Sequence, residues 1–291
     1  MRDLVRKFTG RTADSYKVQS LLYRLGFRDT PPGVQSIEIP LLYREWENLI
    51  PPRDLWPNSK DDFVHYIRWA FEYRAYLTLL CGMRQDASVL ELGCNHGRTM
   101  LALVDYLRPP GRYEGLDIRL REIEFAQRHV HKTYPLFNFT YADIYNQMYN
   151  SQGRQSAETF RFPYSGASFD IVFAASLFTH LLPPAALNYF KESRRVLRGG
   201  GRCLFSFLAL DYYRGRGPLA CFDFPHSLEG FERMAVHDKN NPEAIIAYEI
   251  SLINEMAAEA GLRVRRVIPG YWSDMQKLSV NEQDLFLLEA V

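Results

Sequence analysis

The sequence has few cysteines and no metal-type spacing among them. Four cysteines occur in 291 residues, and no two of them form a Cys-x-x-Cys pair, the spacing typical of structural zinc and redox sites. They are Cys81, Cys94, Cys203 and Cys221. Cys94 and Cys203 fall in or beside predicted strands, where a thiol usually serves as a small buried hydrophobic group. We therefore expect no metal site and a reducing, cytoplasmic location.

An excess of charge of one sign is also missing. The formal net charge is +1, so the protein has no overall field that would attract a polyanion, and nucleic acid is not an expected partner. No apolar run approaches the roughly 18 residues that a membrane helix needs. With 47% hydrophobic and 24% charged residues, the composition is that of a soluble globular protein without membrane contact. A homodimer is possible on this composition.

Regular helical spacing is lacking from the first part of the chain. Residues 1–60 contain six prolines, which interrupt helices. We expect this segment to be an irregular N-terminal cap that covers the acceptor side of the protein with Tyr43, Trp46 and Trp56. A second domain is predicted over 61–291.

Strands and helices alternate within residues 61–291. The predicted strands are 88–92, 113–116, 137–142, 169–174, 202–208, 262–267 and 284–291. The predicted helices are 61–80, 99–107, 120–131, 183–197 and 242–261, the last capped by Asn241. This order favours an α/β fold, a mostly parallel sheet with helices on both faces. Residues 209–240 form an insertion after the fifth strand.

Three consecutive strand ends carry groups suited to adenosine. The first strand leads into a turn that contains Gly93 and Gly97, and glycines allow a ligand to approach the backbone at the carboxyl end of such a sheet. Asp117 ends the next strand, 20 residues after Gly97, where a carboxylate can accept hydrogen bonds from ribose hydroxyls. Asp143 ends the third strand and can accept from the adenine amine. The pattern predicts an adenosine-containing cofactor.

The same segment resembles the class I S-adenosylmethionine-dependent methyltransferases. Glu91, Gly93, Asn95 and Gly97 match the family's acidic-x-Gly-x-Gly-x-Gly motif, with asparagine at the middle glycine. Asparagine is the residue after glycine that best tolerates a positive φ angle. Segments 168–173, 176–180 and 195–201 are similar to the family's fourth strand, its active-site turn and the turn into its fifth strand. The resemblance implies a Rossmann-like sheet of seven strands with an antiparallel last strand.

The resemblance also implies a cofactor and its contacts. S-adenosylmethionine would bind and leave as S-adenosylhomocysteine. The positions that match the family's cofactor site are Glu91 at the methionine amino group, Gly93, Asn95 and Gly97 beneath the cofactor, Asp117 and Ile118 at the ribose, Asp143 and Ile144 at the adenine, and Ala174 and Ser176 after the fourth strand.

Other functions fit the residues less well. The Gly-x-Gly-x-x-Gly turn of a nicotinamide dehydrogenase would need glycines where Asn95 and Arg98 stand. Enzymes that methylate nucleobase amines have a proline-braced motif where this chain has 173–176 without proline. No acid that could hold Mg²⁺ occurs between Val172 and Leu182. A non-catalytic protein that keeps the methyltransferase fold remains an alternative.

The expected acceptor is a small molecule. The chain resembles bacterial enzymes of glycan and natural-product modification, which favours a hydroxyl acceptor, with an amine or carbon acceptor as the alternative. His180 follows the fourth strand, and its imidazole can accept a proton at neutral pH, so it is the candidate general base. The candidates for the acceptor pocket are Phe178, Asp211, Tyr212 and His226, with Tyr213, Phe222 and Phe224 nearby.

Overall fold

A computed structural model describes residues 49–52, 55, 63–213, 223–273 and 281–291. The predicted cap residues Tyr43, Trp46 and Trp56, most of the segment 1–60, and Phe222 and Cys221 of the insertion lie outside the described residues. Residues 48–291 form one compact unit. Within the part of the chain that is described, no helix is long and apolar enough to cross a membrane.

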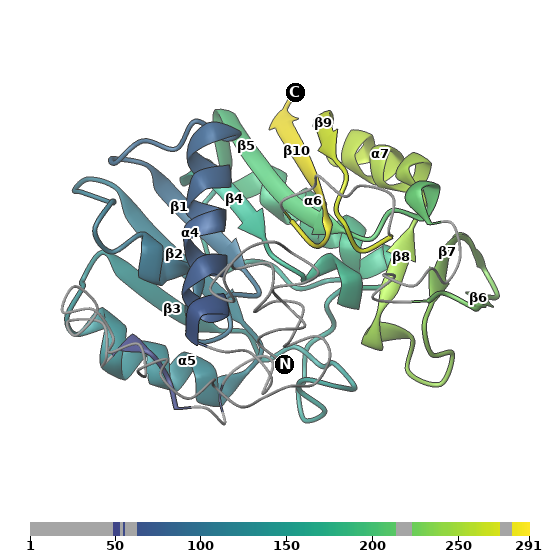
Figure 1. The fold of residues 1–291 in the computed structure, drawn as a ribbon, viewed down its shortest axis with the longest axis horizontal. Helices are drawn as coiled ribbons and strands as arrows, with labels where there is room; N and C mark the ends of the chain where they lie inside the picture. The colour runs from purple at the N-terminus through teal and green to yellow at the C-terminus, as the bar shows by residue number, and fades with distance from the viewer. Residues whose placement is uncertain (1–48, 53–54, 56–62, 214–222, 274–280) are drawn as a thin grey trace, which may run out of the picture. The chain divides into compact units, whose positions relative to one another are not determined.

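Seven strands form the main sheet, in the order β3-β2-β1-β4-β5-β10-β9 (Figure 1). Their bounds are β1 Ser88–Leu92, β2 Arg112–Asp117, β3 Phe137–Tyr141, β4 Phe169–Ala174, β5 Leu197–Phe207, β9 Leu262–Ile268 and β10 Asp284–Ala290. Strands β1 to β5 pair in parallel, whereas β10 is antiparallel to both of its neighbours. The predicted Rossmann-like sheet with an antiparallel last strand is confirmed.

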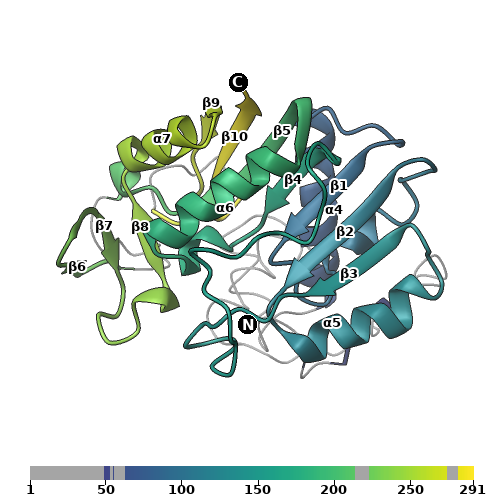
Figure 2. The same ribbon diagram turned by 180° about the vertical axis from the view of Figure 1, so that it is seen from behind.

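Helices cover both faces of this sheet. Figures 1 and 2 show α4 on one face and α6 and α7 on the other. The helical elements are α4 Phe63–Leu79, η3 Thr99–Ala102, α5 Leu120–Ala126 with its π-helical continuation η4 Gln127–His131, η5 Phe178–His180, α6 Pro183–Val196, η6 Leu210–Tyr212, η7 Pro242–Ala244 and α7 Ile250–Glu259. Helix α6 begins with two prolines, which are tolerated in a first turn because its N–H groups have no intrahelical partner.

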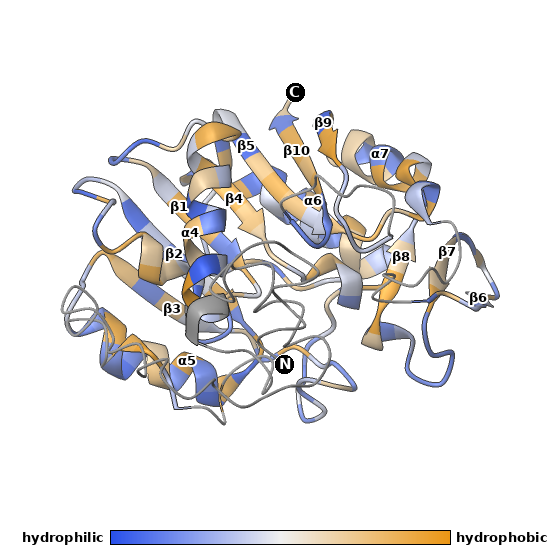
Figure 3. Ribbon diagram, in the orientation of Figure 1, coloured by the Kyte–Doolittle hydropathy of each residue, from blue (hydrophilic) through white to orange (hydrophobic). Residues whose placement is uncertain are grey.

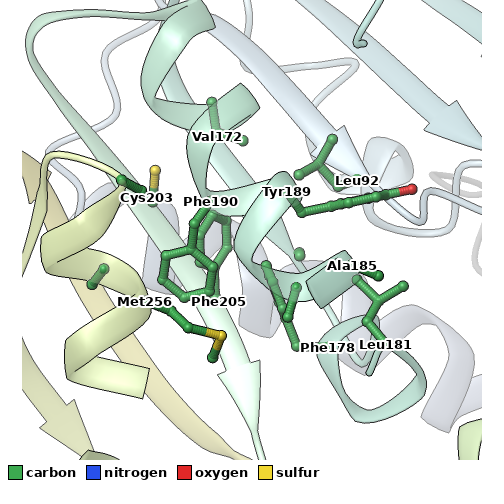
Figure 4. Close-up of a cluster of buried hydrophobic side chains, with 14 of the residues drawn as sticks. Leu92, Val172, Phe178, Leu181, Ala185, Tyr189, Phe190, Cys203, Phe205 and Met256 are labelled. Carbon is green, nitrogen blue, oxygen red and sulfur yellow. The ribbon is translucent and has the colours of Figure 1, made fainter. Parts of the chain in front are cut away.

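The largest core cluster lies between the sheet and the helices α6 and α7. Strand β4 is apolar along most of its length, as expected for a strand covered on both faces, and Figure 3 shows the hydrophobic colour along β4 and β5. In Figure 4, Phe178 packs with Phe190 and Phe205, at ring centroid distances of 5.2 and 4.7 Å. This aromatic anchor fixes η5 after β4 and therefore the position of His180.

The predicted helix 99–107 is wrong as an α-helix. The structure has the single 3-10 turn η3, followed by turns, and the Leu103 N–H donates to the Met100 carbonyl three residues back at 2.8 Å. All residues from Thr99 to Val104 are buried. A segment without a solvent-exposed face lacks the amphipathic pattern of a regular surface helix, and here it packs as a tight connection against α4.

The predicted helix 242–261 is wrong at its start. Asn241 makes no capping hydrogen bond, η7 is a single turn, and Ile246–Tyr248 form strand β8, so the helix α7 begins only at Ile250. Strand β8 joins β6 His226–Leu228 and β7 Phe231–Val236 in a second, antiparallel sheet. Its three residues are buried, and the Tyr248 N–H donates to the Leu208 carbonyl at 2.9 Å.

Candidate cofactor and acceptor site

A cavity of about 470 Å³ opens at the carboxyl ends of the parallel strands. That volume lies within the usual range for small-molecule sites, and its place is where open α/β sheets bind cofactors. Four strand ends contribute to the lining, with Leu92, Gly93, Cys94 and Asn95 at the end of β1 and in the turn that follows, Leu116, Asp117 and Ile118 at the end of β2, Ala142 and Ile144 after β3, and Ala175, Ser176 and Leu177 after β4.

The turn after β1 is built from left-handed backbone. Gly93, Asn95 and Gly97 have φ angles of +75°, +53° and +86°. The N–H groups of Gly93 and Cys94 both donate to the Leu116 carbonyl, at 2.8 and 3.2 Å. A Cβ atom at Gly97 would lie 2.9 Å from the Phe139 ring, so this position needs glycine for space as well as for conformation. Asn95 takes the positive φ that the sequence predicts.

Asp117 lies at the cavity wall with both carboxylate oxygens anchored. Its Oδ2 accepts the Asn95 N–H at 2.6 Å, and its Oδ1 accepts the Arg119 N–H at 2.8 Å. Burial raises the pKa of the carboxyl, although these two donors act in the opposite direction. Each oxygen keeps a further lone pair, so the group can still accept hydrogen bonds from two neighbouring hydroxyls.

Glu91 is a buried carboxyl that also lines the cavity. It accepts hydrogen bonds from the hydroxyls of Thr99, at 3.0 Å, and Tyr113, at 2.5 Å. Burial raises its pKa to about 8 in spite of these donors. A cation beside it would stabilise the ionised form, which suits the methionine ammonium group that the resemblance places here.

Asp143 has a partner outside the cavity. Its carboxylate pairs with Arg154 at 2.5 Å and accepts the Tyr141 hydroxyl at 3.2 Å, and the guanidinium lowers its pKa. Its neighbours Ala142 and Ile144 do line the cavity. The structure therefore presents this strand end to the cavity through apolar side chains, and a contact of the Asp143 carboxylate with adenine stays a prediction.

The turn after β4 is held by a polar network. Ser176, with a φ of +60°, donates its N–H to the Ser206 hydroxyl at 2.7 Å and accepts from the Gln283 amide at 2.7 Å. The Ser206 hydroxyl closes the network by donating to the Gln283 oxygen at 2.8 Å. Ser176 lines the cavity, whereas Ala174 and Phe178 are fully buried in the core.

His180 lines the cavity in a defined tautomer. Its Nδ1 lies 3.0 Å from the backbone carbonyl of Glu243, and because a carbonyl oxygen only accepts, Nδ1 carries the proton. Its Nε2 lies 3.4 Å from the Tyr149 hydroxyl. Burial lowers the pKa of the imidazole. The ring is therefore neutral at pH 7, with Nε2 as its proton acceptor.

The predicted acceptor residues of the insertion do not line this cavity. Asp211 accepts the Ile250 N–H at 2.8 Å, at the first turn of α7. Tyr213 and Phe224 pack around Trp272 in a separate small cluster. Tyr212 and His226 are partly buried elsewhere in the insertion.

Several lining residues were not predicted. They are Trp69 of α4, Arg98 and Arg119 at the strand ends, Tyr145, Asn146 and Tyr149 of the loop after β3, Tyr189 of α6, and Glu243 and Glu282. Trp69 lies in a helical pattern that predicts only core packing, and the loop residues carry no motif. Arg119 alone could have been inferred, because it directly follows Asp117 and Ile118, which the sequence predicts at the end of a strand.

Comparison with known proteins agrees with this geometry. Residues 90–205 match the family described as "Methyltransferase domain". A protein from Pyrococcus horikoshii is similar in structure, with a TM-score of 0.55 at 18% identity over 86% of this chain and 98% of that one. An S-adenosylmethionine-dependent methyltransferase from Mesorhizobium loti has a TM-score of 0.50 at 13% identity, covering 75% of this chain and 96% of its own.

A third similar structure is the magnesium protoporphyrin IX methyltransferase from Synechocystis with bound S-adenosylhomocysteine. Its TM-score is 0.49 at 14% identity, over 82% of this chain and 92% of that one.

Strand order and matched domain together define the class. Residues 90–205 are a methyltransferase domain, and the seven strands have the order of the Rossmann-like methyltransferase fold. The protein is an S-adenosylmethionine-dependent methyltransferase. S-adenosylmethionine is its methyl donor. The residues present fit this cofactor. Glu91 is a buried carboxyl whose ionised form a neighbouring ammonium group would stabilise, and each carboxylate oxygen of Asp117 keeps a lone pair that can accept from a ribose hydroxyl.

Proposed function

We propose that the protein methylates a hydroxyl group of a small-molecule acceptor, a sugar or another natural product. The observation that carries the proposal is the tautomer of His180, a residue of the cavity lining whose unprotonated Nε2 has the Tyr149 hydroxyl as its neighbour at 3.4 Å. A hydroxyl is a weak nucleophile until its proton is removed, and a neutral imidazole is suited to remove it.

S-adenosylmethionine, when bound, would supply an activated methyl group on its sulfonium, with the neutral thioether of S-adenosylhomocysteine as the leaving group. The residues of this chain then have three tasks. The left-handed turn at Gly93 and Asn95 and the carboxylate of Asp117 orient the cofactor in the cavity. The aromatic ring of Tyr149 packs edge-on against His180 at 5.2 Å and restricts the imidazole. His180 takes the acceptor proton at Nε2, while the Glu243 carbonyl stabilises the imidazolium through Nδ1–H.

An amine acceptor is the second candidate. Glu243 and Glu282 are residues of the cavity lining, and burial raises the pKa of the Glu243 carboxyl. Carboxylates in this place would attract an ammonium group of an acceptor. An ammonium group would have to lose a proton before the methyl transfer, so His180 could act as the base for an amine acceptor as well. The two candidate functions therefore differ only in the atom that is methylated.

The test is turnover with a panel of hydroxyl and amine acceptors, comparing wild type with His180→Ala and His180→Gln. We expect methylation of a hydroxyl acceptor, a loss of roughly 10²–10⁴-fold in turnover in both variants, and unchanged affinity for S-adenosylhomocysteine. Near-normal turnover of the variants would refute His180 as the base. Methylation of amines alone would refute the hydroxyl acceptor.

A further inference from the structure

The cofactor turn contains a strained residue that a chain of hydrogen bonds supports. Asn95 has a φ of +53°, a conformation that costs energy for any residue with a Cβ atom and that glycine adopts freely. Its backbone N–H donates to Asp117 Oδ2 at 2.6 Å. If Asn95 left this conformation, the N–H that holds the ribose-binding carboxylate would move with it.

The side chain of Asn95 is bonded to the next residue. Its Oδ1 accepts the His96 N–H at 2.8 Å and lies 2.6 Å from His96 Nδ1. An amide oxygen only accepts, so Nδ1 carries the proton and Nε2 of a neutral ring is an acceptor. Burial lowers the pKa of His96 to about 3, helped by the charges of Arg98 and Arg119 and opposed by a hydrogen bond to the backbone of Leu55, so the ring is neutral.

Helix α4 supplies the next member of the chain. The Tyr66 hydroxyl lies 2.5 Å from His96 Nε2, and the two rings stack with centroids 5.6 Å apart and an interplanar angle of 10°. Both side chains are fully buried. Because Nε2 accepts, the Tyr66 hydroxyl donates to His96, and His96 in turn donates from Nδ1 to the Asn95 side chain.

A second contact joins the same turn of α4 to the cofactor segment. The Arg98 guanidinium lies 4.9 Å from the ring centroids of both Tyr66 and Trp69, and its Nε donates to the Tyr66 carbonyl at 3.1 Å. Trp69 and Arg98 line the cavity. The helix therefore contacts the segment 95–98 on both sides of Gly97.

We propose that Tyr66 and His96 are positioning residues, which through hydrogen bonds to the Asn95 side chain hold a non-glycine residue in the left-handed conformation that cofactor binding needs. We call this chain of hydrogen bonds, from Tyr66 through His96 to the Asn95 side chain, the relay. The relay stabilises in asparagine a backbone conformation that the glycine of the family's motif adopts without support. It concerns the affinity for the cofactor, so its failure is distinguishable from failure of the proposed acceptor chemistry.

The test is a double-mutant cycle with Tyr66→Phe and Asn95→Gly, measured as the Kd for S-adenosylhomocysteine by calorimetry. We expect Tyr66→Phe alone to weaken binding roughly 3–10-fold, the range for one lost neutral hydrogen bond. In the Asn95→Gly background the same substitution should change binding less than about 2-fold, since glycine needs no support. Equal losses in both backgrounds, or no loss in either, would overturn the proposal.

Tyr76→Phe is the matched control. Tyr76 is another tyrosine of α4, and its ring packs edge-on against Tyr73, with ring centroids 5.7 Å apart. Its hydroxyl has no hydrogen-bond partner among the described residues, so we expect Tyr76→Phe to leave the Kd unchanged. A change in Kd as large as that of Tyr66→Phe would show a general effect of α4 and contradict the relay.

The wild-type protein offers an independent readout that needs no variant to fold. Nitrogen-15 NMR of the imidazole, assigned with His96→Gln, should show His96 neutral and protonated at Nδ1 throughout about pH 5–8. A ring protonated at Nε2, or one that titrates in this range, would overturn the proposal.

Discussion

We predict that Glu91 couples cofactor binding to the release of a proton. With a pKa raised to about 8 by burial, this carboxyl is mostly protonated at pH 7 in the cofactor-free protein. A bound ammonium group lowers the pKa, so the carboxyl should ionise as the cofactor binds. We predict the release of about one proton per S-adenosylhomocysteine bound at pH 7, measured by calorimetry in buffers of different ionisation enthalpy.

The control for this proton release is Glu91→Gln, which keeps the shape of the side chain but cannot ionise. We expect binding to be weaker and its heat to be independent of the buffer. A wild-type heat that is also independent of the buffer would show that Glu91 does not face the ammonium group.

The lowered pKa of His180 predicts the pH dependence of turnover. A general base works when it is unprotonated, and burial moves the protonation of His180 below the ordinary histidine value near 6.5. The value of kcat/KM should therefore stay level as the pH falls from 8 through about 6.5 and decline only below it. The measurement is a pH profile with the native acceptor. A decline centred above 7 would point to a different base.

Strand ends predicted part of the cavity lining, whereas the loops could not be predicted. Glu91 and Asp117 lie among the last residues of apolar strands and His180 follows one, and parallel strands bring their carboxyl ends to one edge. The predicted strand-end residues Asp143 and Ala174 do not line the cavity. Tyr149 and Glu243 reach the same cavity from irregular segments, whose placement depends on contacts that no local pattern encodes.

At the scale of elements, a buried carboxylate ties the start of β10 to its surroundings. Asp284 accepts three hydrogen bonds at 2.7 Å, from the N–H groups of Ala209 and Gly270 and from the Trp272 indole. Asp284→Asn would place an amide N–H against one of these donors. We expect a loss of about 1–3 kcal/mol in the free energy of unfolding, measured by urea denaturation.

Asp211→Asn is a comparison for Asp284→Asn, because Asp211 accepts the Ile250 N–H but is exposed at the surface, whereas Asp284 is buried. Its cost should be at most about 1 kcal/mol. Equal stability of the wild type and Asp284→Asn would contradict the structural role of this carboxylate.

The spacing of apolar residues predicted most helices and strands. It failed where pairing with a distant strand determines the secondary structure. The helix 183–197 and the strands 88–92 and 169–174 have patterns that match their final burial. Ile246, Ile250 and Ile253 have helical spacing too, but Ile246 pairs with Val236 of β7 and becomes part of a strand. Hydrogen bonding to a distant segment overrides a local preference.

At the scale of the whole molecule, residues 48–291 contain the complete sheet and the cavity. Leu49 and Leu55 are buried in this unit, so a shortened chain should begin at residue 48 rather than at 61. We predict that residues 48–291 fold and bind S-adenosylhomocysteine within about 3-fold of the full chain, measured by calorimetry, because the described residues that line the cavity all lie within this range.

The same shortened chain tests the proposal that the N-terminal segment acts as a cap over the acceptor. We expect it to lose selectivity among acceptors, or activity toward the native one, while it still binds cofactor. Full activity and unchanged selectivity would show that residues 1–47 have no part in acceptor binding.

The order of the strands could be predicted because alternating strands and helices leave few right-handed arrangements of a parallel sheet. That order brings the turn after β1 next to Asp117 at the end of β2. The central claim is that the cofactor binds there, with its ribose on Asp117.

The most direct test is calorimetric titration of S-adenosylhomocysteine into the wild type and Asp117→Ala. Removing hydrogen bonds to a charged group should weaken binding by about 1.5–3 kcal/mol, or on the order of 10–100-fold, while circular dichroism shows the fold retained. Tight binding by the wild type with this loss in the variant is the predicted result. Unchanged affinity in Asp117→Ala, or no binding by the wild type, would contradict the account.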